Sequence, residues 1–147
     1  MSNKISVTQV LPRRLAVVRE QTERCLLGAV IPKLLAEVYS FLKDAPVTQT
    51  GQNIVLYLDT KSTIEVGVEV SGPFERSGRV VPSATPGGMT ISMVHQGPYA
   101  NLPAAHQSIR RFCAETGRRP VGPNWEIYGD WEEDQEKLRT QVFYLVL

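Results

Sequence analysis

Cysteine is scarce in this chain: Cys25 and Cys113 are its only two, and no C-x-x-C spacing joins them. Two isolated cysteines argue against a disulfide scaffold and a zinc finger, and are typical of reduced thiols in a cytoplasmic protein. The N-terminus, Met-Ser-Asn-Lys-Ile-Ser, also lacks the apolar segment of a signal peptide. We therefore expect a cytoplasmic protein of bacterial type.

Excess charge of either sign is missing, because 16 basic residues offset 15 acidic ones and leave a net charge of +1. Such a chain has no general attraction for nucleic acid or acidic lipid. No apolar run in the sequence approaches the roughly 18–20 residues that cross a bilayer. We therefore expect neither direct nucleic-acid binding nor membrane contact.

Motifs for common catalysts and cofactors are missing as well. The sequence has no Gly-x-Ser-x-Gly, P-loop, dinucleotide fingerprint or His-Glu-x-x-His. No third ligand at metal spacing accompanies His95 and His106. We therefore expect no cofactor and no metal.

An internal repeat is present. Residues 29–59 align without gaps onto 100–130, and seven of the 31 aligned positions are identical, against about two expected from average residue usage. The identities include residues that are typical of helix starts and turns, such as the prolines Pro32 and Pro103 and the glycines Gly51 and Gly122. The sequence therefore predicts a tandem duplication.

Each half of the chain has the pattern strand, helix, strand, strand. The prediction is one α+β domain over 1–147, a tandem βαββ duplication with antiparallel sheets, two helices and a central ligand cleft between the halves. Its first copy covers about 4–72, its connector about 73–87 and its second copy about 88–147. The expected strands are 4–10, 14–20, 53–59, 63–70, 89–95, 124–131 and 140–147, with a short strand at 79–83, helices at 29–44 and 102–116, and a turn at 60–62.

Glu126 is the position at which the two copies differ most in chemistry, because the first copy has Val55 there. A carboxylate at a position where the same fold tolerates valine is not needed for folding alone. We therefore predict that Glu126 has a functional role. The alternative is an ordinary ion pair at an edge or surface, for example with an arginine.

Strand alternation predicts which way Glu126 points. In the first copy Ile54 and Leu56 form an apolar face that is expected under the helix. Carried onto the second copy, this alternation places Trp125 under the helix and turns Glu126 and Tyr128 to the opposite face. The expected result is a groove between the copies with one negative charge.

Tyrosines from both copies are expected to wall this groove. Tyr57 and Tyr128 approach it from opposite sides, while Glu126 stands on one side only. Aromatic faces attract cations by roughly 0.5–2 kcal/mol per good contact, and a bound cation offsets the cost of burying a carboxylate. A flat, lipophilic cation satisfies both demands.

Two short motifs carry a family resemblance. Residues 95–99 read His-Gln-Gly-Pro-Tyr, and residues 122–128 read Gly-Pro-Asn-Trp-Glu-Ile-Tyr. Their order and spacing resemble GyrI-like ligand-binding domains, which also serve as effector-binding modules of AraC- and MerR-type regulators. The resemblance implies a tandem βαββ fold and a pocket for lipophilic, often cationic compounds. By motif position it implies Glu126 as the buried charge partner, accompanied by Tyr128 and Tyr99.

Regulators that carry this domain also have a helix-turn-helix region, whereas only about ten residues precede the strand expected at 14–20 here. We therefore expect a stand-alone module. Stand-alone relatives include drug binders, an inhibitor of DNA gyrase, and hydrolases that open cyclopropane rings. Three functions stay open: a drug or effector binder, a hydrolase, and a gyrase-inhibitor-like protein that binds gyrase or a transcription regulator. In the hydrolase, Glu126 is the general base and Tyr128 or Tyr99 the proton donor.

The remaining candidates are weaker, since each has an equally simple structural role. Tyr57 and Tyr99 are either pocket walls or ordinary core and rim residues. Met93 and His95 either face the groove or pack in the core. Trp131, at the end of a hairpin, is a candidate lid.

One helix position changes character between the copies, because His106 stands in place of Leu35. A partly buried, hydrogen-bonded histidine is the favoured interpretation there, and a catalytic histidine is the alternative.

Overall fold

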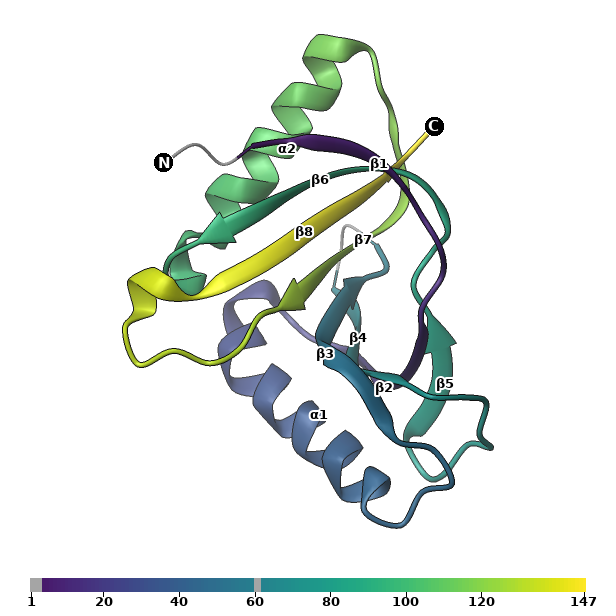
Figure 1. The fold of residues 1–147 in the computed structure, drawn as a ribbon. Coiled ribbons are helices and arrows are strands. Elements are labelled where there is room, and N and C mark those ends of the chain that lie inside the picture. The colour runs from purple at the N-terminus through teal and green to yellow at the C-terminus, as the bar shows by residue number, and fades with distance from the viewer. Residues whose placement is uncertain (1–3, 60–61) are drawn as a thin grey trace. The chain divides into compact units, whose positions relative to one another are not determined.

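The computed structural model describes residues 4–59 and 62–147, so residues 60 and 61 of the expected turn lie outside the described part (Figure 1). The chain forms two compact units. One consists of Pro12–Thr85, and the other combines the segment ending at Leu11 with Pro86–Leu147. The structure therefore supports a two-part organisation within an α+β fold.

The unit of Pro12–Thr85 is an antiparallel sheet with one helix. Its strands lie in the order β3-β4-β2-β5. The elements are β2 (Arg14–Gln21), the 3-10 turn η1 (Arg24–Leu26), α1 (Leu27–Leu42), β3 (Gln49–Tyr57), β4 (Thr63–Val70) and β5 (Val80–Ala84).

The second unit has the same composition. Its strands lie in the order β1-β6-β8-β7, again all antiparallel. The elements are β1 (Ser6–Val10), β6 (Gly88–Gln96), the 3-10 turn η2 (Tyr99–Asn101), α2 (Leu102–Thr116), β7 (Pro120–Tyr128), the 3-10 turn η3 (Gln135–Lys137) and β8 (Arg139–Val146).

The hairpins of the two units pair in the same register. Val55 lies opposite Val66 in one hairpin, and Glu126 lies opposite Val142 in the other. The predicted antiparallel sheets and two helices are confirmed. The tandem duplication itself stays a prediction, with which this shared register agrees.

Two short strands pair differently from the expected copies. β1 pairs with β6, although the sequence groups residues 4–10 with the first copy. β5, which falls in the expected connector, pairs with β2. The fourth strand of each unit, β5 in one and β1 in the other, therefore lies outside the strand–helix–strand–strand segment that forms the rest of the unit.

Both helices lie close to their predicted positions. α2 has the predicted bounds and ends at Gly117, whose φ of 70° is the left-handed conformation that favours glycine. α1 with the preceding turn, Arg24–Leu42, spans 19 residues of mean hydropathy 1.6. By length and composition it is long enough to cross a membrane, so the expectation that no such run exists is wrong. In the structure α1 lies against β2 and β4 with Leu34 and Val38 buried.

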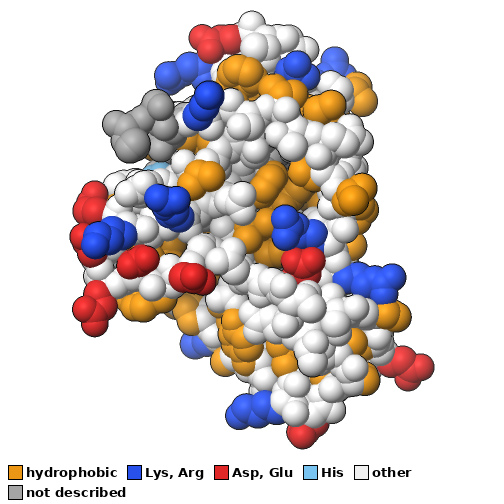
Figure 2. Space-filling model, in the orientation of Figure 1, with side chains coloured by type: hydrophobic (Ala, Val, Ile, Leu, Met, Phe, Trp, Pro, Cys, Tyr) orange, Lys and Arg blue, Asp and Glu red, His pale blue; other side chains and the backbone are white. Residues whose placement is uncertain are grey.

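The surface carries charges of both signs. On the face shown in Figure 2, acidic and basic side chains are interspersed with apolar ones. This distribution agrees with the net charge of +1.

Candidate functional site

Glu126 faces its helix, contrary to the sequence-based expectation. On β8, Val142 and Tyr144 belong to the buried cluster that also contains Ile109 of α2. Glu126 lies directly opposite Val142 across the strand pair, and side chains that face each other across strands share one side of the sheet. The prediction that Glu126 and Tyr128 turn away from the helix is therefore wrong.

Trp125 lies on the other face. Its ring stacks on Phe143, with centroids 5.3 Å apart and planes 9° from parallel. Phe143 alternates with the residues that meet α2, and Trp125 is only 2% exposed. Both faces of this hairpin are thus buried, which is why an apolar pattern alone does not identify the one beneath the helix.

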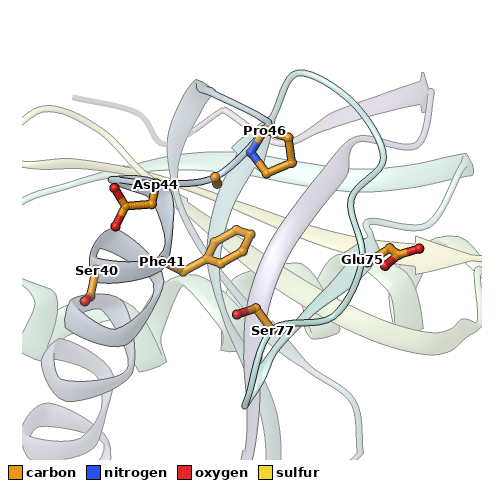
Figure 3. Close-up of a pocket in the computed structure, with 7 residues that line it drawn as sticks. Ser40, Phe41, Asp44, Pro46, Glu75 and Ser77 are labelled. Atoms are coloured by element: carbon orange, nitrogen blue, oxygen red, sulfur yellow. The ribbon is translucent and has the colours of Figure 1, made fainter.

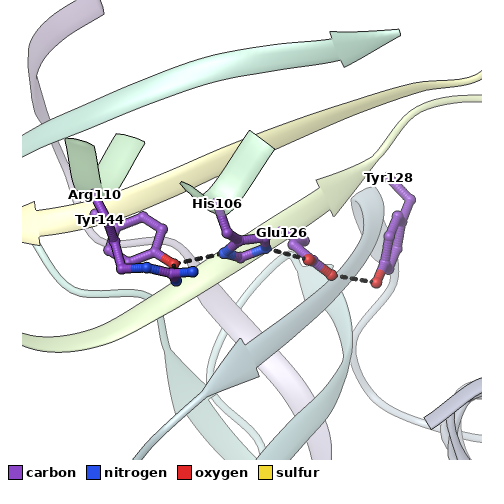
Figure 4. Close-up of polar contacts among 5 residues, drawn as sticks. All are labelled: His106, Arg110, Glu126, Tyr128 and Tyr144. Atoms are coloured by element: carbon purple, nitrogen blue, oxygen red, sulfur yellow. Dashed lines mark hydrogen bonds and ion pairs between the residues drawn. The ribbon is translucent and has the colours of Figure 1, made fainter. Parts of the chain in front are cut away.

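The Glu126 carboxylate is buried and hydrogen-bonded at both oxygens. The residue is 3% exposed. Oε1 accepts a hydrogen bond from the Tyr128 hydroxyl at 2.6 Å, and Oε2 lies 2.6 Å from Nε2 of His106 (Figure 4). A strand residue and a helix residue therefore hold this carboxylate together.

The contact continues beyond His106. Its Nδ1 lies 2.6 Å from the Tyr144 hydroxyl, which accepts a hydrogen bond from Nη1 of Arg110 at 2.9 Å. If Tyr144 gives its own hydrogen to Nδ1, Nε2 carries the remaining imidazole hydrogen and donates it to Glu126. The hydroxyls of Tyr128 and Tyr144 and the imidazole N–H then each have an acceptor. We call these five residues the Glu126 cluster.

The other unit carries no such cluster at the matching positions. The offset of the internal alignment puts Leu35 at the place of His106 and Val55 at the place of Glu126. The matching registers put Val68 at the place of Tyr144, opposite Asn53 in one unit and Asn124 in the other. The same helix-on-sheet arrangement thus forms with apolar residues at these three positions, and burying polar groups there instead commonly costs stability. Folding alone does not account for the Glu126 cluster.

Tyr99 is joined to this cluster through Tyr128. Their rings meet edge to face with centroids 5.5 Å apart. Tyr99 lies in η2 and is 40% exposed, while Tyr128 is half-buried. Burial raises the pKa of the Tyr99 phenol, so this side chain stays neutral and able to donate a hydrogen bond at physiological pH.

The other predicted residues differ in burial and in the element that carries them. Met93 is 4% exposed and packs in the core beneath α2. Trp131 follows β7 and is 70% exposed. Tyr57 ends β3 in the unit of Pro12–Thr85 and is half-buried. The structure therefore brings Glu126, Tyr128 and Tyr99 together within one unit.

Sequence reasoning missed Arg110 and Tyr144 and understated His106. The histidine was expected to be hydrogen-bonded and partly buried, but its partner was not identified. The signal was the Leu35-to-His106 difference, which coincides with the Val55-to-Glu126 difference. Two polar replacements at paired positions indicate mutual contact more strongly than either does alone.

His95 has a local role. Its Nε2 lies 3.1 Å from the carbonyl oxygen of Pro98, and the residue is 6% exposed. The imidazole therefore supports the turn that leads into α2. Within residues 4–59 and 62–147, no group of three or more His, Cys, Asp or Glu side chains is arranged to hold a metal ion.

Each unit carries a surface hollow. One of about 230 Å³ lies at β1, β6 and β8 and includes Ser6, Ser92 and Phe143. The other, of about 560 Å³, surrounds the Phe41 ring at the end of α1 (Figure 3). Its lining consists of Ser40, Phe41, Asp44, Ala45, Pro46, Glu75 and Ser77. Neither lining includes Glu126, which is 3% exposed.

Comparison with protein families gives one match, and it covers nearly the whole chain. The model of the GyrI-like small molecule binding domain matches residues 3–146. No curated protein matches the sequence.

Solved structures share the fold at low sequence identity. The crystal structure of the EcmrR C-terminal domain is 18% identical with a TM-score of 0.87, covering 100% of this chain and 99% of that one. In the EcmrR–DNA complex the match spans 57% of the EcmrR chain. SAV2435 bound to tetraphenylphosphonium is 14% identical with a TM-score of 0.72, covering 98% and 94% of the two chains. A hydrolase from Listeria innocua is 14% identical with a TM-score of 0.63, covering 99% and 92%.

Proposed function

We propose that this chain, which belongs to the GyrI-like family of small-molecule-binding domains, takes lipophilic organic cations as ligands and pairs them with the Glu126 carboxylate. The observation that carries the proposal is a 3% exposed carboxylate at a position where the matching strand has Val55. A buried carboxylate is costly unless it is compensated. A bound cation that offsets the cost of burying the Glu126 carboxylate explains why a glutamate stands at this position.

The groups around Glu126 suit such a ligand. Tyr128 donates to the carboxylate and, together with Tyr99, offers aromatic surface beside it. A cation placed over such a ring gains about 0.5–2 kcal/mol, more when water is excluded. The ligand class is therefore an organic cation with enough apolar surface to replace the side chains that now cover the site.

A structural relative supports the same ligand class. SAV2435 was solved with tetraphenylphosphonium, a lipophilic cation without hydrogen-bond donors. At 14% identity this likeness establishes the fold only. It makes tetraphenylphosphonium a sensible first probe for this chain.

The test is to titrate tetraphenylphosphonium into the wild-type protein and into Glu126→Gln, with binding followed by calorimetry. Truncating one partner of a buried charge pair costs roughly 2–5 kcal/mol, so we expect affinity to fall about thirtyfold or more. The neutral triphenylphosphine oxide should lose far less. Equal losses for the two probes would refute charge pairing.

Glu65 supplies a matched control. It is a second buried carboxylate at 2% exposure, but it lies in the other unit and bonds to Arg19 at 2.7 Å and to Ser83. Glu65→Gln should leave the affinity for tetraphenylphosphonium unchanged after correction for any unfolded protein. A loss as large as that of Glu126→Gln would mean that both variants act through stability.

A second candidate function, a hydrolase, is favoured by the hydroxyl that Tyr128 holds 2.6 Å from the Glu126 carboxylate. A desolvated carboxylate beside a proton donor suits general acid–base chemistry. Glu126 would take a proton from water while the water oxygen bonds to an activated cyclopropane carbon. The ring carbon–carbon bond would break, its electron pair would pass to the conjugated acceptor, and Tyr128 would supply a proton there.

The hydrolase is tested by incubating the protein with a cyclopropane-bearing alkylator and following the product by mass spectrometry. Turnover produces a gain of one water and disappears in Glu126→Gln. If the compound is bound but recovered unchanged, the chain acts as a binder of it and the hydrolase is excluded for that substrate.

A further inference from the structure

The larger surface hollow, at the end of α1, lies wholly in the unit of Pro12–Thr85 and has a volume of about 560 Å³. This volume falls in the range of small-molecule sites, roughly 300–1,000 Å³. The Phe41 ring lies at its centre, with the side chains of Asp44 and Glu75 on either side of the ring in the view of Figure 3. We call it the Phe41 hollow. An aromatic surface between carboxylates is a lining that suits an aromatic cation.

Both walls of the Phe41 hollow are held in place by hydrogen bonds and packing. The chain turns directly after the helix, where the Asp44 N–H donates to the carbonyl oxygen of Phe41 at 3.3 Å. In the opposite wall, Ser77 and Val80 exchange two backbone hydrogen bonds of 3.0 Å. The Phe74 ring packs on Phe41 with centroids 5.0 Å apart. A ligand therefore meets a site that is already formed and loses little affinity to ordering of the chain.

The Phe41 hollow is negatively charged. Within residues 4–59 and 62–147, no ion pair joins Asp44 or Glu75 to a basic side chain, and none of the described lining residues is a lysine or arginine. The arginines that follow Glu75 bond elsewhere, Arg76 to a backbone carbonyl at 3.3 Å and Arg79 to Glu37 at 3.0 Å. Asp44 also follows the C-terminus of α1, where the helix dipole favours a cation.

The matching end of α2 has a different charge pattern. Asp44 aligns with Glu115, and Ser40, four residues earlier, aligns with Arg111. Residues four positions apart lie one helical turn apart, so Glu115 has a basic residue on its side of the helix. Ser40 lines the Phe41 hollow, whereas the adjacent Lys43 does not. The small serine therefore leaves unfilled the volume that an arginine would occupy, and Asp44 lacks the positive charge one turn away.

We propose that the Phe41 hollow is a second ligand site, distinct from the Glu126 cluster of the other unit, and that it binds an arylalkylammonium ion. The aryl group packs on the Phe41 ring, and the ammonium group lies against the carboxylates of Asp44 and Glu75. Aromatic contact and charge pairing thus come from two parts of one small molecule. This inference does not depend on the proposed function, since it uses no residue of the Glu126 cluster.

The experiment is an NMR titration in which the backbone amide signals of the wild-type protein are followed with three probes. Phenethylammonium carries both the ring and the charge, 2-phenylethanol carries the ring without the charge, and ethylammonium carries the charge without the ring. Phenethylammonium should shift the amide signals of residues 40–45 and 75–77. It should bind about fivefold or more tightly than either of the other two probes, because each of them lacks one of the two contacts.

Variants of the lining locate the site. Asp44→Asn and Glu75→Gln should each weaken phenethylammonium about two- to fivefold, the effect of removing one exposed charge partner. Ser40→Arg installs the residue of the matching position at an exposed place on the helix. It should abolish binding, because the arginine fills the hollow with the chain's own cation. Glu115→Gln removes the aligned carboxylate of α2 and, as the matched control, should leave the affinity unchanged.

Several outcomes would overturn the inference. If the amide signals of residues 40–45 and 75–77 do not move at about 10 mM phenethylammonium, which reveals even millimolar affinity, the hollow does not bind this class. Equal affinity for phenethylammonium and 2-phenylethanol also overturns it, as does undiminished binding by folded Ser40→Arg. Glu126→Gln should leave the titration unchanged, and loss of the shifts in that variant would assign them to the Glu126 cluster instead. None of these results decides whether Glu126 binds tetraphenylphosphonium, which its own titration tests.

Discussion

Replacing the Glu126–His106 pair by the apolar pair of the other unit should leave the free energy of unfolding nearly unchanged. Such a result would show that the polar pair does not stabilise the fold. The perturbation is a double-mutant cycle built from Glu126→Val and His106→Leu, the residues that stand at Val55 and Leu35. Glu126→Val removes the carboxylate from its two 2.6 Å contacts, one with the His106 imidazole and one with the Tyr128 hydroxyl. His106→Leu leaves a carboxylate of 3% exposure with one of its two short bonds lost.

The magnitudes follow from the 2.6 Å contact and its burial. Removing one partner of a buried pair costs about 3 kcal/mol, so each single variant should be less stable by roughly that amount. The double variant replaces a buried polar pair by an apolar one of similar size, which is commonly neutral or stabilising. We expect it to lie within about 1 kcal/mol of the wild type, which gives a coupling energy of about 5–7 kcal/mol.

Urea unfolding followed by tryptophan fluorescence measures these values in the relevant part of the chain. Trp125 and Trp131 both lie in the unit that contains the cluster, so the signal reports on that unit. Comparable dependence of the unfolding free energy on urea in all four proteins is needed for the comparison. If the double variant is less stable by the sum of the single losses, the apolar pair does not substitute for the polar one, and the argument from the other unit is wrong.

Three further predictions concern packing and thiols. Gly67→Ala should lower the free energy of unfolding by several kcal/mol, because an added Cβ would lie 1.8 Å from a backbone carbonyl oxygen of β2. Gly28→Ala in α1, where an added Cβ meets nothing within 4 Å, should raise it by about 0.5–1 kcal/mol. Equal urea midpoints for the two variants would contradict this. Thr140→Val should stabilise by about 1 kcal/mol, since its buried hydroxyl has no hydrogen-bond partner in the part of the chain that is described; a loss of stability in the same assay would show that the hydroxyl is satisfied. Burial raises the pKa of the Cys113 thiol, so a thiol reagent at mildly alkaline pH should modify the exposed Cys25 at once and Cys113 only on unfolding. The stability that the neutral Cys113 thiol contributes should be lost as pH rises through its folded-state pKa. Rapid modification of both thiols in the folded protein would contradict the burial of Cys113.

The elements of the fold could largely be predicted because local chemistry determines them. The apolar stripe of residues 102–116, followed by Gly117, has the spacing and the cap of a helix, and α2 has those bounds. The β3–β4 hairpin likewise follows from two apolar strands that lie close together in the sequence. The partners of β1 and β5 could not be predicted, because five-residue strands carry no local signal for the strand they join at long range.

The candidate site could be predicted in part for a related reason. Comparing the two copies singled out Glu126, since a buried-type position changes from valine to glutamate. The predicted direction of the Glu126 side chain was wrong because Trp125 and Glu126 are both buried. Neither face of the strand therefore shows the polar pattern of a solvent-exposed side. Once the helix is placed on the correct face, His106 meets Glu126, and the two polar replacements become one contact.

The most direct test of the central claim, that Glu126 serves as the charge partner of a lipophilic cation, is a comparison of two probes of like shape and opposite charge. Tetraphenylphosphonium and tetraphenylborate should be titrated into the wild type and into Glu126→Gln under the same conditions. The account predicts that the wild type prefers the phosphonium and that the preference falls about thirtyfold or more in the variant. An unchanged ratio of the two affinities would contradict it.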